Sequence, residues 1–170
     1  MDPDPYCSPL LLFAENVDFH AIAYILLLIL LFMVSALMSG SETALFSLSK
    51  SEIETFRSSR NPSEENVARL LEKPERLLAT ILIVNNFVNI GIVLIFEYLL
   101  RYYLVIEHPV LRVIVSVVLT TFLLVLFGEV LPKVYATGNY KGFSRFASGP
   151  MTVVVSLMRI FSAPFMLLSR

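Results

Sequence analysis

Oxygen-bearing side chains recur inside three long apolar segments of the sequence. They are Ser35 and Ser39 in the first segment, Asn85, Asn86 and Asn89 in the second, and Glu129, between Gly128 and Pro132, in the third. Carboxylate, carboxamide, hydroxyl and backbone carbonyl oxygens are hard ligands, which suit Mg²⁺, Ca²⁺ or Na⁺ and not zinc or copper. One carboxylate does not neutralise a divalent cation, so dipoles or a second, proton-like coupling step must balance the remaining charge.

These residues fall at similar depths if each segment is a helix that crosses a membrane. At 1.5 Å per residue, Ser39 lies about 27 Å from the outer end of the first helix, and Glu129 about 27–30 Å from that of the third. Asn85 lies about 12 Å from the cytoplasmic start of the second helix. In a hydrocarbon core of about 30 Å, these three residues lie in the cytoplasmic half and Asn89 reaches the midplane. The spacing therefore predicts oxygens from three helices at a shared level.

Two positions are expected to interrupt the helices and expose backbone carbonyls. Gly40 stands inside a Ser-Gly-Ser motif, and Pro132 follows Glu129 by three residues, where it weakens the helix. Backbone that leaves a helix at membrane depth must face a cavity or an ion. We therefore predict helix breaks at Gly40 and Pro132, with Ser41 and Thr43 as further candidate ligands.

Each polar residue also has a simpler interpretation. A serine in a membrane helix commonly bonds the carbonyl four residues earlier. An intramembrane asparagine commonly joins two helices, with a contribution of about 1 kcal/mol. Asn85 and Asn89 fit this description, with Asn86 as a further candidate ligand, and Glu129 would then mark the membrane edge. In this alternative the chain is a non-transporting scaffold or regulatory module whose intramembrane polar residues stabilise a dimer.

The apolar residues are concentrated in charge-free blocks of membrane-spanning length. Hydrophobic residues make up 56% of the 170 residues and charged residues 16%, against about 45–50% and 25% in soluble domains. The blocks cover residues 21–38, 77–96 and 113–128, the last extended by 109–111. We therefore predict an all-α integral membrane fold with three spans, at about 21–40, 76–98 and 109–131. The net charge of −1 gives no support for a nucleic-acid partner.

The unequal distribution of Lys and Arg predicts the orientation. Residues 1–20 contain none, 42–76 contain six, 97–112 contain two and 133–145 contain three. The positive-inside rule places the N-terminus outside and the C-terminus in the cytoplasm. Residues 1–20 then form an extracytoplasmic leader that contains the single cysteine, Cys7. The leader lacks the basic region of a cleavable signal peptide, which is the other interpretation of the first block.

Amphipathic helices are predicted on the cytoplasmic side of the membrane, at about 44–58, 62–73 and 146–168. The last region has a polar stripe of Ser148, Thr152, Ser156 and Arg159. Such a stripe is typical of a helix that lies along the membrane surface. A fourth span is the alternative, although it would bury Arg159 at a cost of about 2.5–3.5 kcal/mol.

Three stretches resemble the signature motifs of the CorC/CNNM family of magnesium transporters. They are SGSETALFSLSKSEIE, LLATILIVNNFVNIGI and FGEVLPKVYA. Residues 21–170 are similar to the family's transmembrane domain, the domain of unknown function number 21. The resemblance includes a bacterial subgroup associated with gliding motility. It implies a homodimer with a juxtamembrane belt, and nucleotide binding only through a pair of cytosolic modules that this sequence does not include.

The resemblance also implies an activity and a ligand set. The expected activity is Mg²⁺ transport in the bacterial inner membrane, as export with Na⁺ as a possible coupling ion. The implied metal ligands are Ser35, Ser39, Gly40, Asn85, Asn89, Gly128 and Glu129. No enzymatic activity is expected, because His20 and His108 have no nucleophile near them and no glycine-rich phosphate loop is present.

Overall fold

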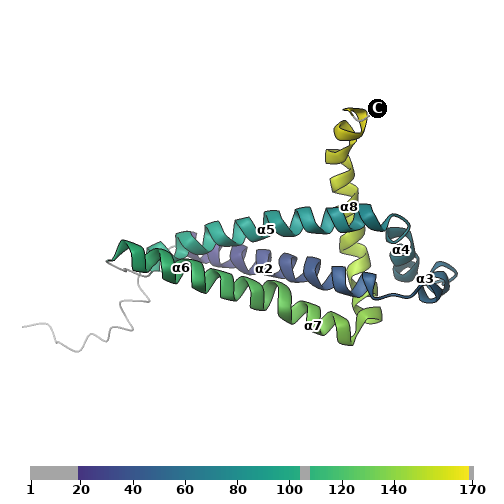
Figure 1. Cartoon of the computed structure of the whole chain (residues 1–170), viewed down its shortest axis with the longest axis horizontal. Helices are drawn as coiled ribbons and strands as arrows, with labels where there is room; N and C mark the ends of the chain where they lie inside the picture. Colours follow the sequence, from purple (N-terminus) through teal and green to yellow (C-terminus); the bar gives the residue numbers. More distant parts are fainter. Residues whose placement is uncertain (1–18, 104–107, 169–170) are drawn as a thin grey trace, which may run out of the picture.

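Helices make up all the regular secondary structure in the described part of the chain. The computed structural model describes residues 19–103 and 108–168 (Figure 1). Most of the predicted leader, including Cys7, lies outside the described residues, and so does the side chain of Arg159. The elements are α2 (Phe19–Phe46), α3 (Lys50–Arg57), α4 (Pro62–Leu70), α5 (Pro74–Tyr103), α6 (Pro109–Leu123), the π-helix η1 (Leu124–Val130), α7 (Leu131–Gly138) and α8 (Tyr140–Leu168).

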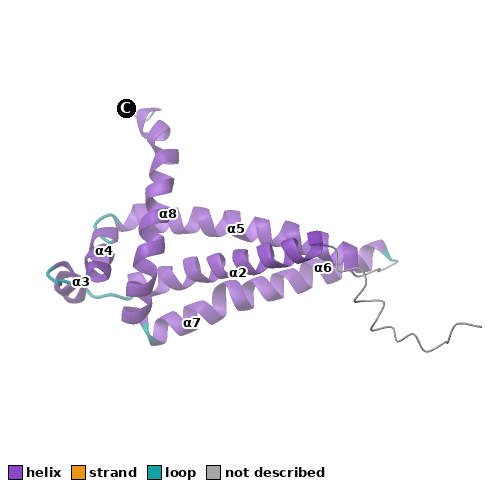
Figure 2. Ribbon diagram, turned by 180° about the vertical axis from the view of Figure 1, so that it is seen from behind, coloured by secondary structure: helices purple, strands orange, loops and turns teal. Residues whose placement is uncertain are grey.

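Three long helical segments run side by side through most of the molecule (Figures 1 and 2). The segments His20–Phe46, Pro74–Tyr103 and Pro109–Gly138 are each long and apolar enough to cross a membrane. Large apolar side chains point outward from them, such as Phe87, which is 72% exposed, and Met33, which is 66% exposed. Such a surface is stable only against lipid or a partner. The predicted all-α membrane fold with three spans is confirmed.

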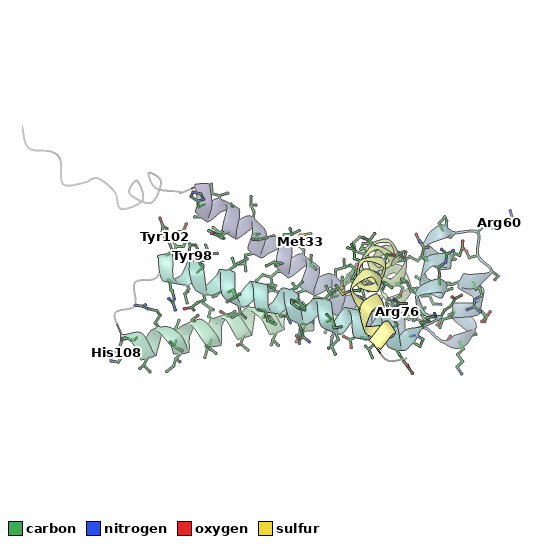
Figure 3. The ribbon with its side chains drawn as sticks, turned by 90° about the horizontal axis from the view of Figure 1, so that it is seen from above. Met33, Arg60, Arg76, Tyr98, Tyr102 and His108 are labelled. Carbon is green, nitrogen blue, oxygen red and sulfur yellow. The ribbon has the colours of Figure 1, made fainter. Side chains whose placement is uncertain are left out.

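Arg76 and Tyr98 mark the two ends of the membrane-spanning part of α5. Figure 3 shows Tyr98 and Tyr102 toward one end of the bundle and Arg76 at the other. The ring of Tyr98 packs against Tyr24 of α2 with 4.6 Å between the ring centroids, and tyrosines gather where a membrane meets water. The helical rise gives about 33 Å between Arg76 and Tyr98. This distance matches a hydrocarbon core of about 30 Å, so α5 spans it between these two levels.

The helices α3, α4 and α8 close one end of the bundle. Figures 1 and 2 show that α8 runs across the ends of the spans and not alongside them. The interfacial interpretation of this region predicts such a crossing, whereas a fourth span would pack parallel to the others. The apolar core lies where these helices meet α2 and α5, and includes Met38, Leu45, Val67, Leu77 and Met151.

Two ion pairs fasten α8 to the α3–α4 hairpin. The Lys141 ammonium lies 2.7 Å from the Glu52 carboxylate, and the Arg145 guanidinium lies 2.7 Å from that of Glu64. Glu52 also forms a capping box with Ser49 at the start of α3. The hydrogen bond from Lys141, with those from Ser49, lowers the pKa of Glu52 from its ordinary 4.5 to about 2. The same pairing raises the pKa of Lys141.

The bounds of the juxtamembrane helices differ from the predicted ones. Residues 44–46 continue α2, and a separate helix begins at Lys50 because Ser49 caps it, so the predicted helix at 44–58 is wrong. The helix predicted at 62–73 begins at Pro62 but ends at Leu70, before the Pro74 turn. The helix predicted at 146–168 begins earlier, at Tyr140, because its first turns pack on the α3–α4 hairpin.

Candidate metal site

Ser35 lies where α2 meets α5, and two carboxamide oxygens converge on it. Its hydroxyl is fully buried and lies 3.1 Å from Asn85 Oδ1 and 2.9 Å from Asn89 Oδ1. Asn85 and Asn89 are one helical turn apart, so both reach α2 from the same face of α5. The single proton of the hydroxyl satisfies one acceptor fully and not both. The three oxygens therefore form a small cluster with more acceptors than protons, which is an arrangement that a cation stabilises.

The third span reaches this cluster through Gly128. Gly128 is buried, and a Cβ atom at this position would lie 2.9 Å from the Ser35 Oγ. Gly128 belongs to η1, and π-helical turns are frequent at functional sites. Pro132 has no N–H, so the α-helical hydrogen bond from residue 132 to the Gly128 carbonyl does not form. The predicted break at Pro132 is wrong, because the chain stays helical there and starts α7 at Leu131, but the hydrogen-bonding pattern changes at this level.

Ser39, one turn after Ser35 on α2, contacts the backbone of Glu129. Its hydroxyl is buried and donates to the Glu129 carbonyl oxygen at 3.4 Å. The Glu129 side chain is partly exposed and has no ion-pair or hydrogen-bond partner among the described residues. The backbone of Glu129 therefore lies beside the oxygen cluster, and Glu129 is the one carboxylate of the predicted ligand set.

The structure thus groups most of the predicted ligands around the α2–α5–η1 contact. The residues grouped there are Ser35, Ser39, Asn85, Asn89, Gly128 and Glu129. No cluster of three or more His, Cys, Asp or Glu side chains occurs in the described ranges 19–103 and 108–168. A cation held here would therefore be bound by neutral oxygens and a single carboxylate.

Gly40 does not join this group, and the prediction that it breaks the first helix is wrong. The helix α2 continues through Gly40 to Phe46, so the Gly40 carbonyl remains inside the helix. A Cβ atom at Gly40 would lie 2.5 Å from Cζ of Phe143, so glycine here lets α8 pack closely on α2. Ser41 donates to the Leu37 carbonyl and Thr43 to that of Ser39, at 3.5 Å. Both follow the simpler interpretation of a helical hydroxyl.

Asn86 also lies apart from the cluster. Its side chain is exposed, and with Asn89, Ile90, Val93 and Leu94 it lines a groove on the outer surface of α5. The groove is otherwise apolar and lies within a membrane span. An amide exposed in hydrocarbon is costly without a hydrogen-bonding partner, so this face of α5 is suited to contact with another helix.

An ion pair between two of the signature stretches was not predicted from the sequence. Lys133 Nζ of α7 lies 3.6 Å from the Glu42 carboxylate of α2. This pair joins the first and third spans about one turn beyond Ser39 and Glu129, toward the α8 end. The available signal was that SGSET contains the acidic Glu42 and GEVLPK ends in the basic Lys133, each close to the end of its span.

The fold and the site define a class of protein: a helical membrane domain with an oxygen-lined polar cluster between three spans. Residues 25–170 match the family described as the cyclin M transmembrane N-terminal domain, CNNM. The chain therefore belongs to the CNNM family, which confirms the resemblance inferred from its motifs.

Two bacterial relatives are similar over much of this chain. A "UPF0053 protein" of Haemophilus influenzae is 36% identical over 137 residues, which are 80% of this chain and 31% of that protein. The "UPF0053 inner membrane protein YfjD" of Escherichia coli is 35% identical over 104 residues, which are 61% of this chain and 23% of that protein. The chain thus spans less than a third of the length of either relative.

Proposed function

We propose that this domain transports Mg²⁺ across a membrane and that the cluster around Ser35 binds the ion on its way. The observation that carries this proposal is the convergence of two asparagine oxygens on one buried serine hydroxyl. Buried polar groups in a span are costly unless they are satisfied, and those that persist commonly lie on ion pathways. Gly128, Ser39 and Glu129 extend the same cluster from the other two spans.

The oxygens of this cluster are of the kind that Mg²⁺ takes as ligands, in an octahedral set at about 2.0–2.1 Å. The Ser35 Oγ lies 3.1 Å and 2.9 Å from the two asparagine oxygens. Together with Ser39, the Gly128 carbonyl and the Glu129 carboxylate, these atoms offer enough oxygens to replace the water that Mg²⁺ sheds reluctantly.

The setting of transport is part of the same proposal. The basic residues of 42–76 and 133–145 favour a cytoplasmic location for α3, α4 and α8, with the N-terminus outside. The Escherichia coli relative is named as an inner membrane protein, which supports the bacterial inner membrane for this chain. Entry of Na⁺ down its gradient would supply the free energy for export of Mg²⁺.

A homodimer is also part of the proposal. The exposed Asn86 amide and the apolar groove around it are a suitable surface for a second copy of α5. The scaffold alternative assigned Asn85 and Asn89 to this same contact. Their oxygens accept from Ser35 of the same chain, while Asn89 also lines the groove beside Asn86.

The experiment that tests the proposal is a flux measurement on Glu129→Gln. The wild-type and variant proteins are reconstituted in vesicles, and Mg²⁺ movement is followed with an entrapped magnesium-sensitive dye. We expect transport to fall to the level of empty vesicles, because the variant removes the only carboxylate of the cluster. Glu75→Gln, at the exposed start of α5, is the matched control. Wild-type flux from a folded Glu129→Gln protein would refute the proposal.

A further inference from the structure

A basic cavity lies where the turn between α4 and α5 meets α8. Its volume is about 230 Å³. One wall carries Arg69, Lys73 and Arg76, and the opposite wall carries the hydroxyls of Thr152 and Ser156 from α8. Guanidinium, ammonium and hydroxyl groups are all hydrogen-bond donors. The Thr152 hydroxyl already donates to the Ser148 carbonyl at 2.7 Å, so the donors that line the cavity are the three basic side chains and the Ser156 hydroxyl. None of these residues belongs to the cluster around Ser35.

The charges around the cavity favour an anion. Glu72 is the single acidic residue among those that line it, against three basic ones. The Glu72 carboxylate lies 3.7 Å from Arg57 of α3, which offsets its charge from outside the cavity. Arg69 is paired with Glu65 at 2.7 Å, which holds its guanidinium in place beside the cavity. The lining therefore carries three cations against one carboxylate, and that carboxylate has a cationic partner outside the cavity.

The position and lining of the cavity point to a lipid as the source of that anion. Arg76 and Leu77 lie in the first turn of α5, where the span enters the hydrocarbon layer, and Figure 3 shows Arg76 beside α8. Leu70, Leu77 and Val155 add apolar surface to the same lining. A phosphate with an attached glycerol and acyl chains matches this mixture of donors and apolar groups. A free inorganic anion would make no favourable contact with the apolar residues.

We propose that this cavity binds the phosphate of an anionic phospholipid headgroup. Basic pockets at this level of membrane proteins are a recognised site for such headgroups. Lys73 and Arg76 contribute positive charge, and the Ser156 hydroxyl donates to a remaining phosphate oxygen. The bound lipid would join α5 to α8 at the point where α8 leaves the bundle. The proposal concerns a second site and does not depend on the transported ion.

The test measures lipid binding to the purified full chain in neutral detergent. Short-chain phosphatidylglycerol is titrated and its binding is followed by native mass spectrometry. We expect the wild-type protein to bind the lipid. The double variant Lys73→Gln/Arg76→Gln should have a dissociation constant about tenfold to thirtyfold higher, because it removes two cations that attract the anionic headgroup. Arg60→Gln is the matched control, since Arg60 lies at the far tip of the α3–α4 hairpin (Figure 3). It should bind as tightly as the wild type.

A second variant covers the case in which the double variant does not fold. Ser156 is exposed on α8, so Ser156→Phe should be tolerated while its ring fills the cavity and excludes the headgroup. Undiminished binding by a folded Ser156→Phe or double variant would overturn the proposal. Equal binding of short-chain phosphatidylcholine would also overturn it, because that headgroup carries no net charge. Displacement of the lipid by millimolar inorganic phosphate alone would reassign the cavity to a soluble anion.

Discussion

Gly128 touches Ser35: a Cβ atom on the glycine would lie 2.9 Å from the serine Oγ. This contact places the backbone of η1 directly on the hydroxyl around which the asparagine oxygens gather. Gly128→Ala should therefore displace the hydroxyl by a few tenths of an ångström and separate the three oxygens. We expect the apparent affinity for Mg²⁺ to fall about tenfold, a common cost of disturbing groups that orient metal ligands. The apparent affinity is measured from the flux into vesicles as a function of Mg²⁺ concentration.

Gly138→Ala provides the control for this prediction. Gly138 lies at the end of α7, and a Cβ atom there would meet nothing within 4 Å. It makes the same chemical change in the same span, so its Mg²⁺ affinity should equal that of the wild type. An equal loss in both variants would mean that helix propensity, and not the contact with Ser35, causes the effect.

Asn85 and Asn86 are adjacent in the sequence and should have opposite roles. Asn85→Ala removes an oxygen that lies 3.1 Å from Ser35, so it should lower the apparent Mg²⁺ affinity and leave the dimer intact. Asn86→Ala removes an exposed amide and should weaken dimerisation by about threefold to tenfold, as expected for an interhelical hydrogen bond in a membrane. Flux titration and analytical ultracentrifugation in detergent separate the two effects. Dissociation of the dimer by Asn85→Ala with unchanged ion binding would support the scaffold alternative.

The spans and the level of the site could be predicted from the sequence because both depend on local counting. A charge-free block of sufficient length must cross the membrane, and a fixed rise per residue places Ser35, Asn85 and Gly128 at similar depth. The structure then shows the three in contact. Their rotation about each helix axis, which decides contact, was suggested only by the four-residue spacing of Asn85 and Asn89.

The behaviour of the two predicted helix breaks could not be derived from local sequence. Gly40 remains helical because Phe143, about a hundred residues later, packs on it. Pro132 is accommodated by a change from α- to π-helical hydrogen bonding in η1. At Gly40 the distant contact with Phe143 accompanies an unbroken helix, whereas at Pro132 the adjustment is a local change in hydrogen bonding. The ion pairs of Glu52 and Glu64 with α8 were missed because surface charges have no sequence pattern that identifies their partners.

The pair between Glu52 and Lys141 should make the docking of α8 sensitive to acid. The pKa of Glu52 is lowered from 4.5 to about 2 in the folded protein. The pair therefore contributes its full stability above pH 4.5 and loses it as the pH falls toward 2. The raised pKa of Lys141 means that its charge is lost only above its ordinary value of 10.5. Thermal unfolding of the purified protein, measured between pH 6 and about 2.5, reports this loss of stability.

Glu52→Gln tests this assignment. The variant should unfold at a lower temperature than the wild type at pH 6, and the gap should narrow as the pH falls, because the wild type loses the same interaction. Glu75→Gln is the matched control and should unfold in parallel with the wild type over the whole range. A gap for Glu52→Gln that stays constant with pH would show that the carboxylate contributes through packing and not through its charge.

Gly40→Ala distinguishes the packing role of this glycine from the predicted helix break. The new Cβ would lie 2.5 Å from Phe143 Cζ, and that ring is in edge contact with Tyr135 and Phe146, with centroids 6.2 and 6.0 Å away. Crowding of this kind costs about 1–3 kcal/mol, more than the gain of up to about 1 kcal/mol in helix propensity. We expect a net loss of stability in reversible unfolding by denaturing detergent.

The double variant Gly40→Ala/Phe143→Leu completes this test, because a smaller side chain at residue 143 makes room for the added methyl group. If the glycine serves close packing, the two changes should be coupled: the double variant should be more stable than the sum of the single effects predicts. If the glycine instead served to break α2, alanine would straighten the helix whatever the size of residue 143, and the two effects would add. Additive free energies of unfolding would therefore contradict the packing role of Gly40.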